Sequence, residues 1–253
     1  LSTQSKTWEG IYKISYVDLT NNTQISNRYR LGFKFKDIIV SETSLGVTEK
    51  IIVGHDARIS SPILKRSFIE GARDEGTDIL DIGLATIDMI CFASGYFHLP
   101  AAMITASHNP KEFNGFKLMK NNVDLFPTKD LETIINQEKH ALSQEKGSVT
   151  EENIGGDYLK HALSFINIEA IRPMRIVIDA NSGAVGSIFK SVLEKLPVEY
   201  LPINFAPNGN FPNHEPDPTK EKNITDLKTA VNAGHYHFGC AFDGDGDRII
   251  FVD

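Results

Sequence analysis

Apolar runs rich in β-branched residues alternate with amphipathic stretches along most of the chain. Residues 50–53 (KIIV) and 175–179 (RIVID) are runs of the first kind, and residues 62–75 are a stretch of the second kind. Short apolar runs predict buried strands, and apolar positions at helical spacing predict helices that cover them. Strands and helices that follow each other in turn are typical of an α/β fold.

In the first half of the chain, the pattern predicts strands separated by helices. The strands are expected at residues 50–53, 77–82, 101–105 and 115–120, and the helices at 62–75, 88–97 and 129–140. Pro62 fits the start of its helix, because proline is favoured at the first helical position.

A polar stretch at residues 143–153 separates the two halves, has no apolar periodicity and contains Gly147. We interpret it as the domain boundary, with a first domain at 1–147 and a second at 148–253. In the second domain, helices are expected at 158–166, after a turn at 181–183 and at 223–233, and strands at 175–179, 198–203 and 238–242. Residues 204–220 form a loop with four prolines, and loops of this length inside compact domains are often functional.

Reactive side chains follow two of the predicted strands. Residues 105–110 (TASHNP) place Ser107 in a turn, with Lys117 close behind, and residues 243–248 (DGDGDR) place three carboxylates on alternate positions. Oxygen ligands of this kind favour Mg²⁺ or Ca²⁺. A Mg²⁺ held by carboxylates neutralises the charge of a phosphorylated oxygen. The two motifs together therefore predict phosphoryl transfer through a phosphoserine.

Other interpretations of these motifs fit the sequence less well. An EF-hand loop requires glycine at the position of Arg248, and its last ligand would fall beyond residue 253. A solvated acidic turn is disfavoured, because neighbouring carboxylates after a buried strand repel one another without a cation. A serine hydrolase of the G-x-S-x-G type lacks its motif here. A HAD-type phosphatase or phosphomutase stays open as the second enzymatic interpretation, with Asp243 as the nucleophile and Ser107 incidental.

Four segments together resemble the α-D-phosphohexomutase superfamily. In chain order they are 53–62 (VGHDARISSP), 103–117 (MITASHNPKEFNGFK), 208–220 (NGNFPNHEPDPTK) and 241–248 (AFDGDGDR). The third of them, and residues 114–117, resemble the phosphomannomutase/phosphoglucomutase branch. The resemblance implies the first two domains of this family, each a mixed β-sheet flanked by helices, with the family's domains III and IV absent from this chain.

The resemblance also implies a reaction and a site. The reaction is an intramolecular transfer of phosphate between O1 and O6 of a mannose or glucose phosphate, with a hexose 1,6-bisphosphate as intermediate and activator. Ser107 is the implied phosphoserine, and the implied ligands of one Mg²⁺ are Ser107, Asp243, Asp245 and Asp247. The other implied catalytic residues are Lys117 and His108, and the residues implied to bind phosphate or substrate are Arg58, Asn109 and Arg248.

Three of these features have structural alternatives. Lys117 is either a general acid/base, which requires its pKa to fall from about 10.4 towards neutrality, or a lysine that binds phosphate. The two arginines, Arg58 and Arg248, either bind phosphate or form structural salt bridges. The turn at 181–186 is either a phosphate-binding nest at a helix N-terminus or a plain tight turn.

The chain departs from the family pattern in two places. The arginine expected near the N-terminus is missing, because residues 12–22 (YKISYVDLTNN) contain none. The sugar-recognition loop and the loop that anchors the distal phosphate are also absent. A non-catalytic remnant that binds metal and phosphosugar therefore stands beside the enzyme as a hypothesis. We expect a surface that contacts the missing C-terminal domains.

Composition narrows the classes of partner and compartment. The net charge of −7 argues against nucleic acid, which is bound by clustered Lys and Arg. No apolar run approaches the ~20 residues that span a bilayer, so no membrane partner is expected. Cys91 and Cys240 belong to no CxxC pair and are expected to be buried thiols in a reducing cytoplasm. The expected small-molecule partner is a hexose phosphate.

Overall fold

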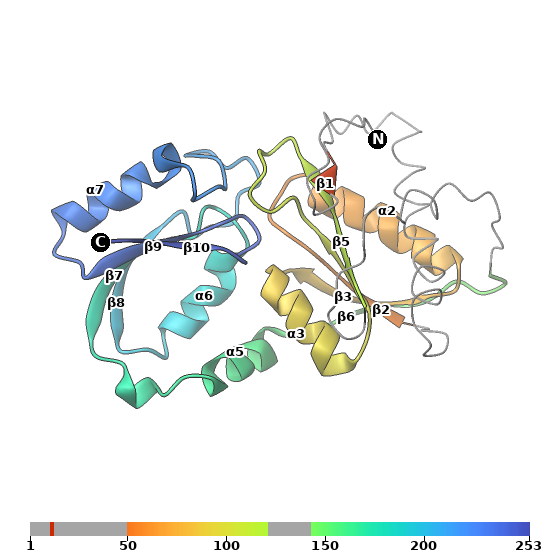
Figure 1. The fold of residues 1–253 in the computed structure, drawn as a ribbon. Helices are drawn as coiled ribbons and strands as arrows, with labels where there is room; N and C mark the ends of the chain where they lie inside the picture. The colour runs from red at the N-terminus through yellow and green to blue at the C-terminus, as the bar shows by residue number, and fades with distance from the viewer. Residues whose placement is uncertain (1–10, 13–49, 121–142) are drawn as a thin grey trace.

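The computed structural model describes residues 11–12, 50–120 and 143–253, which form two α/β units (Figure 1). The first unit contains β1 (Ile11–Tyr12), β2 (Lys50–His55), α2 (Ser61–Asp74), β3 (Asp78–Leu84), α3 (Ile87–Phe97), β4 (Ala101–Ile104), β5 (Asn114–Met119) and β6 (Val149–Glu151). Its strand order is β1-β5-β4-β2-β3-β6. Strand β5 pairs antiparallel with β1 and β4, and the other neighbours are parallel.

The alternating side chains of β2 explain how helices cover both faces of this sheet. Ile51 and Val53 pack on one face against Leu64 of α2. Ile52 packs on the other face against the cluster that contains Ile90 of α3. All five side chains are at most 1% exposed, and full burial of such a side chain contributes about 1.5–3 kcal/mol. The apolar run of β2 therefore forms the centre of the first core.

The second unit is a smaller sheet with a helix on each face. It contains α5 (Gly155–Ser164), a 3₁₀ turn (Ile168–Ala170), β7 (Met174–Asp179), α6 (Val185–Leu193), β8 (Val198–Ile203), a second 3₁₀ turn (Glu221–Ile224), α7 (Thr225–Ala233), β9 (Phe238–Phe242) and β10 (Ile249–Val252). The strand order is β10-β9-β7-β8, with β10 antiparallel to β9. Ile178 packs with Leu193 of α6, and Val177 packs with Leu227 of α7.

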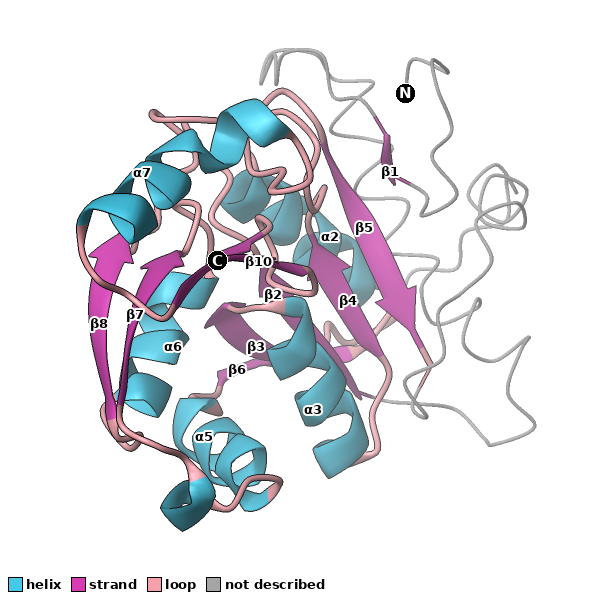
Figure 2. Ribbon diagram, turned by 60° about the vertical axis from the view of Figure 1, so that its left-hand side comes forward, coloured by secondary structure: helices cyan, strands magenta, loops and turns pink. Residues whose placement is uncertain are grey.

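Helix α5 connects the two units. Ile154, just before α5, is 2% exposed and belongs to the core cluster of α3. Tyr158 of α5 and Ile188 of α6 pack against the same cluster. In Figure 2, α5 accordingly lies beside both α3 and α6. This packing brings the loops after β2 and β4 of the first sheet close to the loop after β9 of the second.

The α/β class and the two mixed sheets flanked by helices are confirmed. Three strands were not predicted, and the first of them, β1, pairs with β5. Strand β6 lies inside 143–153 and pairs with β3, so the first sheet extends past the 147/148 division that the sequence suggested. Strand β10 follows the acidic motif and pairs with β9. The predicted helix at 129–140, and residues 13–22 of the segment that lacks arginine, lie outside the described residues.

Cys91 and Cys240 are both free thiols. Cys240 is buried, as expected, whereas Cys91 is only partly buried. Within the described ranges, none of the helices combines the length and apolar character needed to cross a bilayer.

Candidate active site

Ser107 is fully buried and lies in the loop after β4. Its backbone adopts a left-handed conformation, with φ of 50°. Such a conformation costs roughly 1–2 kcal/mol in a residue other than glycine, so the surrounding contacts must hold it. Asn109 closes the turn, because its backbone N–H and its side-chain amide both donate to the Ala106 carbonyl, at 3.0 and 2.9 Å. The backbone N–H of Ser107 donates to Thr105 Oγ1 at 2.8 Å.

Arg58, in the loop after β2, holds the serine loop in place. Its side chain is about as buried as a core residue, at 1% exposure. Its Nε donates to Asp56 at 3.1 Å. Its two Nη atoms donate, over 2.7–3.1 Å, to the carbonyl oxygens of Ser107, Asn109, Pro110 and Phe113. A guanidinium has five N–H groups, and all of them are used. The structure therefore favours the structural salt bridge over the phosphate-binding role for Arg58.

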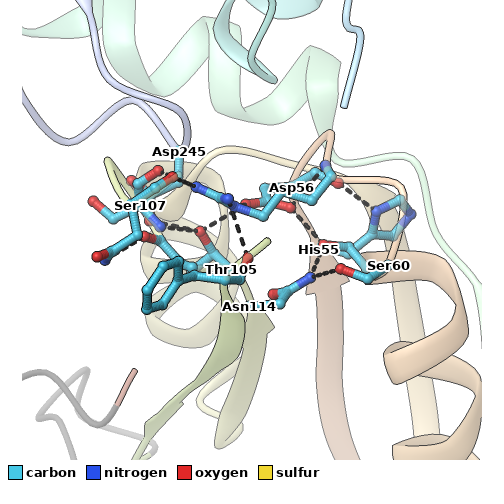
Figure 3. A network of polar contacts seen from close by, with 12 residues as sticks. His55, Asp56, Ser60, Thr105, Ser107, Asn114 and Asp245 are labelled. Atoms are coloured by element: carbon cyan, nitrogen blue, oxygen red, sulfur yellow. Dashed lines mark hydrogen bonds and ion pairs between the residues drawn. The ribbon is translucent and has the colours of Figure 1, made fainter. Parts of the chain in front are cut away.

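Asp56 is the centre of a buried polar network beside Ser107 (Figure 3). Its Oδ1 accepts from Ser61 Oγ at 2.5 Å, and its Oδ2 accepts from Thr105 Oγ1 at 2.9 Å. Thr105 Oγ1 also lies 3.1 Å from Asp245 Oδ2 in the acidic loop. Thr105 thus contacts a carboxylate of each unit while it accepts the N–H of Ser107. Buried networks of this kind favour a single geometry when their members are paired.

The acidic loop after β9 meets the serine loop directly. Ser107 Oγ donates to Asp243 Oδ2 at 2.6 Å. One ligand oxygen from each of Asp243, Asp245 and Asp247 lies within 4.8 Å of the others. Gly244 permits the close approach of the two loops, because a Cβ at this position would lie 2.6 Å from the Ser107 carbonyl oxygen. The serine and the three carboxylates that the sequence singled out therefore form one cluster.

The charges of this cluster are poorly balanced by the protein alone. Burial, with repulsion from Asp245 and Asp247, raises the pKa of Asp243 to about 8. Burial acts in the same way on Asp245, but the Lys117 ammonium outweighs it and lowers the pKa of Asp245. Asp245 Oδ1 is buried and has no hydrogen-bond partner among the described residues. A buried carboxylate oxygen without a donor is costly, so this donor set fits a hard divalent cation.

Lys117, on β5, points into the acidic loop. Its Nζ donates to Asp245 Oδ2 at 3.0 Å and to Asp247 Oδ2 at 3.1 Å, and the side chain is 7% exposed. Burial alone would lower the pKa of Lys117, but the two carboxylates outweigh it and raise the pKa. A general base requires the opposite shift. The geometry therefore supports a charged lysine at this position, which agrees with the alternative that Lys117 binds phosphate.

His108 and Arg248 come from different units and meet at the edge of the cluster. Arg248 Nη1 lies 2.7 Å from His108 Nδ1, and Arg248 Nε lies 3.8 Å from Asp247 Oδ1. Both side chains are partly exposed, in contrast to Arg58. This pair is therefore better placed than Arg58 to meet a ligand that enters from solvent. The Asn109 amide, in contrast, acts within its own turn.

The turn at 181–186 packs against the acidic loop. All its residues are buried, and Asn181 and Ser182 have left-handed φ values of 59° and 54°. A Cβ on Gly183 would lie 2.6 Å from the Gly244 carbonyl oxygen, and the Ala184 N–H donates to the same oxygen at 3.4 Å. The structure therefore favours a plain tight turn over a phosphate-binding nest.

Sequence reasoning missed the residues that support the serine loop. Besides Asp56 and Thr105, they include Asn114, whose amide donates to the hydroxyls of Ser60 and Ser61 at 2.7 and 2.8 Å. The available signal was position, because small polar residues directly follow the apolar strands β2 and β4 or begin β5. Their partners lie in other loops or at the start of α2, so sequence spacing alone does not pair them.

The chain matches known proteins over both units. Residues 19–145 match the family described as "Phosphoglucomutase/phosphomannomutase, alpha/beta/alpha domain I", and residues 156–253 match domain II of the same family. A phosphoglucomutase of Neisseria meningitidis serogroup B is 37% identical, over 86% of this chain and 47% of the relative. A phosphomannomutase/phosphoglucomutase of Pseudomonas syringae pv. tomato is 35% identical, over 84% of this chain and 46% of the relative.

Solved structures agree with these sequence matches. The crystal structure of a phosphoglucomutase/phosphomannomutase family protein from Burkholderia thailandensis superposes with a TM-score of 0.77 and 25% identity, over 93% of this chain and 52% of that one. The chain thus spans about half the length of the relatives it matches. Both family domains match in order, and the cluster of serine and carboxylates lies where they meet. The chain belongs to the phosphoglucomutase/phosphomannomutase family.

Proposed function

We propose that this chain carries the phosphoryl-transfer half of a phosphohexomutase, which moves phosphate between O1 and O6 of a hexose by way of phospho-Ser107. The observation that carries the proposal is the 2.6 Å hydrogen bond from Ser107 Oγ to Asp243, which joins the serine loop of one unit to the acidic loop of the other. Phosphoryl transfer through a serine needs a hydroxyl beside a site of concentrated positive charge. The names of the relatives support a glucose or mannose phosphate as substrate.

The three aspartates of the acidic loop would hold Mg²⁺ together with a phosphate oxygen on Ser107. The bound ion supplies positive charge against the phosphate and the departing serine oxygen. Support for this ligand set comes from the buried Asp245 Oδ1 without a partner and from the convergence of the three carboxylates within 4.8 Å. Lys117 adds a second positive charge next to them.

The steps at Ser107 follow from the chemistry of a phosphoserine. The bond from phosphorus to Ser107 Oγ breaks, a bond from phosphorus to the free hydroxyl of the sugar monophosphate forms, and the hydroxyl proton passes to a base. The resulting 1,6-bisphosphate turns over and returns its other phosphate to Ser107. His108 and Arg248 are the partly exposed donors suited to the sugar phosphate. The general acid/base role of Lys117 stays a prediction from the sequence.

The remaining half of the site belongs, in this proposal, to C-terminal domains that contact this chain. The chain spans about half the length of its relatives, and the loops that would recognise the sugar and its distal phosphate are not in the sequence. Hexose 1,6-bisphosphate serves as activator. The cytoplasmic location also stays a prediction, supported by the free thiols of Cys91 and Cys240.

Neither alternative is favoured. A HAD-type enzyme would use Asp243 as the nucleophile, yet its Oδ1 is engaged by the backbone N–H groups of Gly246 and Arg248 and its Oδ2 by Ser107. The family match also accounts for the motifs around Arg58 and Ser107 that a HAD interpretation leaves unexplained. A non-catalytic remnant gives no reason for the intact serine, lysine and aspartate cluster.

Intact mass spectrometry tests the proposal. The purified chain is incubated with Mg²⁺ and excess hexose 1,6-bisphosphate, and the mass is compared before and after. We expect the wild type to gain one phosphate and Ser107→Ala to gain none. A gain that persists in Ser107→Ala but is lost in Asp243→Asn would instead establish an aspartyl nucleophile. No gain in the wild type would support the non-catalytic remnant.

A further inference from the structure

Residues 204–220, which we call the strap, run between β8 and α7 and contact both units (Figure 1). The strap is the proline-rich loop whose sequence suggested a function. The proposed chemistry uses none of its residues. On the second unit it is fixed at its start, where the Asn208 N–H donates to the Ser182 carbonyl at 2.8 Å. Asn204 Nδ2 donates to Asp179 Oδ1 at 3.0 Å.

The middle of the strap presses against the loop that holds Arg58. Gly209 is buried, and a Cβ there would lie 2.4 Å from both the Ala57 carbonyl oxygen and the Ile59 nitrogen. The Phe211 ring lies against the Arg58 guanidinium, with Cζ 5.3 Å from the ring centroid, and Phe211 is 7% exposed. Since Arg58 donates to four carbonyls of the serine loop, this contact bears on the nucleophile.

The end of the strap reaches the acidic loop. Pro216 is buried, and a Cβ on Gly244 would lie 3.2 Å from Pro216 Cβ. The same Cβ would lie 2.6 Å from the Ser107 carbonyl oxygen, so strap, acidic loop and serine loop meet at one point. Asp217 is 4% exposed and accepts from Thr219 Oγ1 at 2.6 Å, which fixes the turn after Pro216.

His214 anchors the strap to the end of β7. Its Nε2 lies 3.0 Å from Asp179 Oδ2, and its Nδ1 lies 3.0 Å from the Glu215 carbonyl oxygen. An imidazolium can donate to both oxygens, although the Asn204 amide nitrogen, itself a donor, also lies 3.2 Å from Nε2. Burial opposes this charge, but the hydrogen bonds to Asp179 and Glu215 and the charges of Asp179 and Asp226 raise the pKa of His214. Asp179 is fully buried, so the pair fixes the strap at a rigid point.

We propose that the strap positions the nucleophile: Gly209 and Phe211 press Arg58 onto the serine loop, and His214 anchors the strap that carries them. Gly209 and Phe211 are positioning residues that act through Arg58. The effect on rate rests on the proposed function, whereas the effect on the serine loop does not.

Gly209→Ala tests the contact without removing any hydrogen bond. Gly209 does not have a positive φ, so alanine is excluded only by the backbone of the first unit. The matched control is Gly156→Ala in α5, where a Cβ would meet nothing within 4 Å. Hydrogen–deuterium exchange of residues 105–113 is measured in both variants. We expect about tenfold faster exchange in this segment for Gly209→Ala and no change for Gly156→Ala.

Phe211→Leu is the second variant, in case Gly209→Ala does not fold. It keeps an apolar side chain but removes the ring beneath Arg58, and its control is Phe165→Leu, at a position that is 74% exposed. We expect faster exchange in 105–113, and a rate of Ser107 phosphorylation reduced about tenfold at saturating bisphosphate with an unchanged half-saturating concentration. Unchanged exchange in both strap variants would overturn the proposal. Faster exchange in the strap variants, together with a wild type that accepts no phosphate, would support the strap's positioning role and reject the mutase function.

Discussion

At the scale of single residues, the role of a side chain in this site depends on which atoms its donors meet. Arg58 and Arg248 both stand in loops after strands and look equivalent in the sequence. Arg58 donates all its N–H groups to Asp56 and to four loop carbonyls, whereas Arg248 is partly exposed beside His108. Sequence reasoning identified the residue types that the site contains. It could not distinguish the two arginines, because the partners of Arg58 come from a distant segment.

Thr105 gives a residue-scale prediction. Thr105→Val removes the acceptor of the Ser107 N–H and a donor to Asp56, both in buried positions. We expect the free energy of unfolding to fall by about 1–3 kcal/mol, since a buried group that loses its partner costs about that much. Urea denaturation measures the change.

The control for Thr105→Val is the same substitution at Thr77. Thr77 is 1% exposed, and its Oγ1 has no hydrogen-bond partner among the described residues. Thr77→Val is therefore expected to be neutral or stabilising. If both substitutions lower the free energy of unfolding equally, the loss at Thr105 comes from removing a buried hydroxyl and not from its hydrogen-bond network.

At the scale of elements, the strands that sequence reasoning found are those with continuous apolar runs, such as β2, β4 and β7. The three that it missed, β1, β6 and β10, are edge strands. All residues of β6 are exposed, whereas in β10 (IIFV) two exposed positions alternate with the partly buried Ile250 and the buried Val252. Strand β6 is specified by its pairing with β3 and not by a local apolar pattern, whereas β10, which pairs with β9, carries an apolar signal that sequence reasoning overlooked. The strap was recognised as a functional loop, but its contacts with the first unit needed the tertiary structure.

The anchor of the strap gives a prediction about pH. The folded-state pKa of His214 is raised above 6.5, so the folded protein holds this proton more tightly than the unfolded chain. The stabilisation is therefore complete below about pH 6.5 and is lost as pH rises through the raised pKa. We expect the free energy of unfolding of the wild type to exceed that of His214→Gln by about 1.5–3 kcal/mol at the acidic end. The difference should shrink towards alkaline pH.

Denaturation midpoints across this pH range measure the difference. Asp179→Asn removes the carboxylate that faces the ring, so it should flatten the same part of the profile. A wild-type profile that runs parallel to that of His214→Gln at every pH would show that folding does not change the pKa of His214, and it would contradict the prediction.

At the scale of the whole molecule, neither unit holds a complete site. The first supplies Ser107 and Lys117, and the second supplies the three carboxylates. The sequence indicated that these motifs belong together, since their chemistry is complementary. Their actual approach depends on the packing of α5 against α3 and α6, which is set by Ile154 and Tyr158 and has no motif of its own. The relative placement of the units, more than either fold, had to come from the structure.

This arrangement predicts how a cation affects stability. A Mg²⁺ ion bound only by the folded protein should stabilise it, by about 2.7 kcal/mol at a hundredfold excess over the dissociation constant. Asp243→Asn should be more stable than wild type in EDTA near neutral pH, because it removes a carboxyl group whose ionisation is opposed in the folded protein by burial and by Asp245 and Asp247. The same variant should lose most of the gain in stability from Mg²⁺.

The control is Asp157→Asn, on the exposed surface of α5, which makes the same chemical change and should keep the gain. Thermal unfolding of the three proteins with EDTA or Mg²⁺ provides the comparison. An equal gain in wild type and Asp243→Asn would place the cation elsewhere and remove the acidic loop from the proposed chemistry.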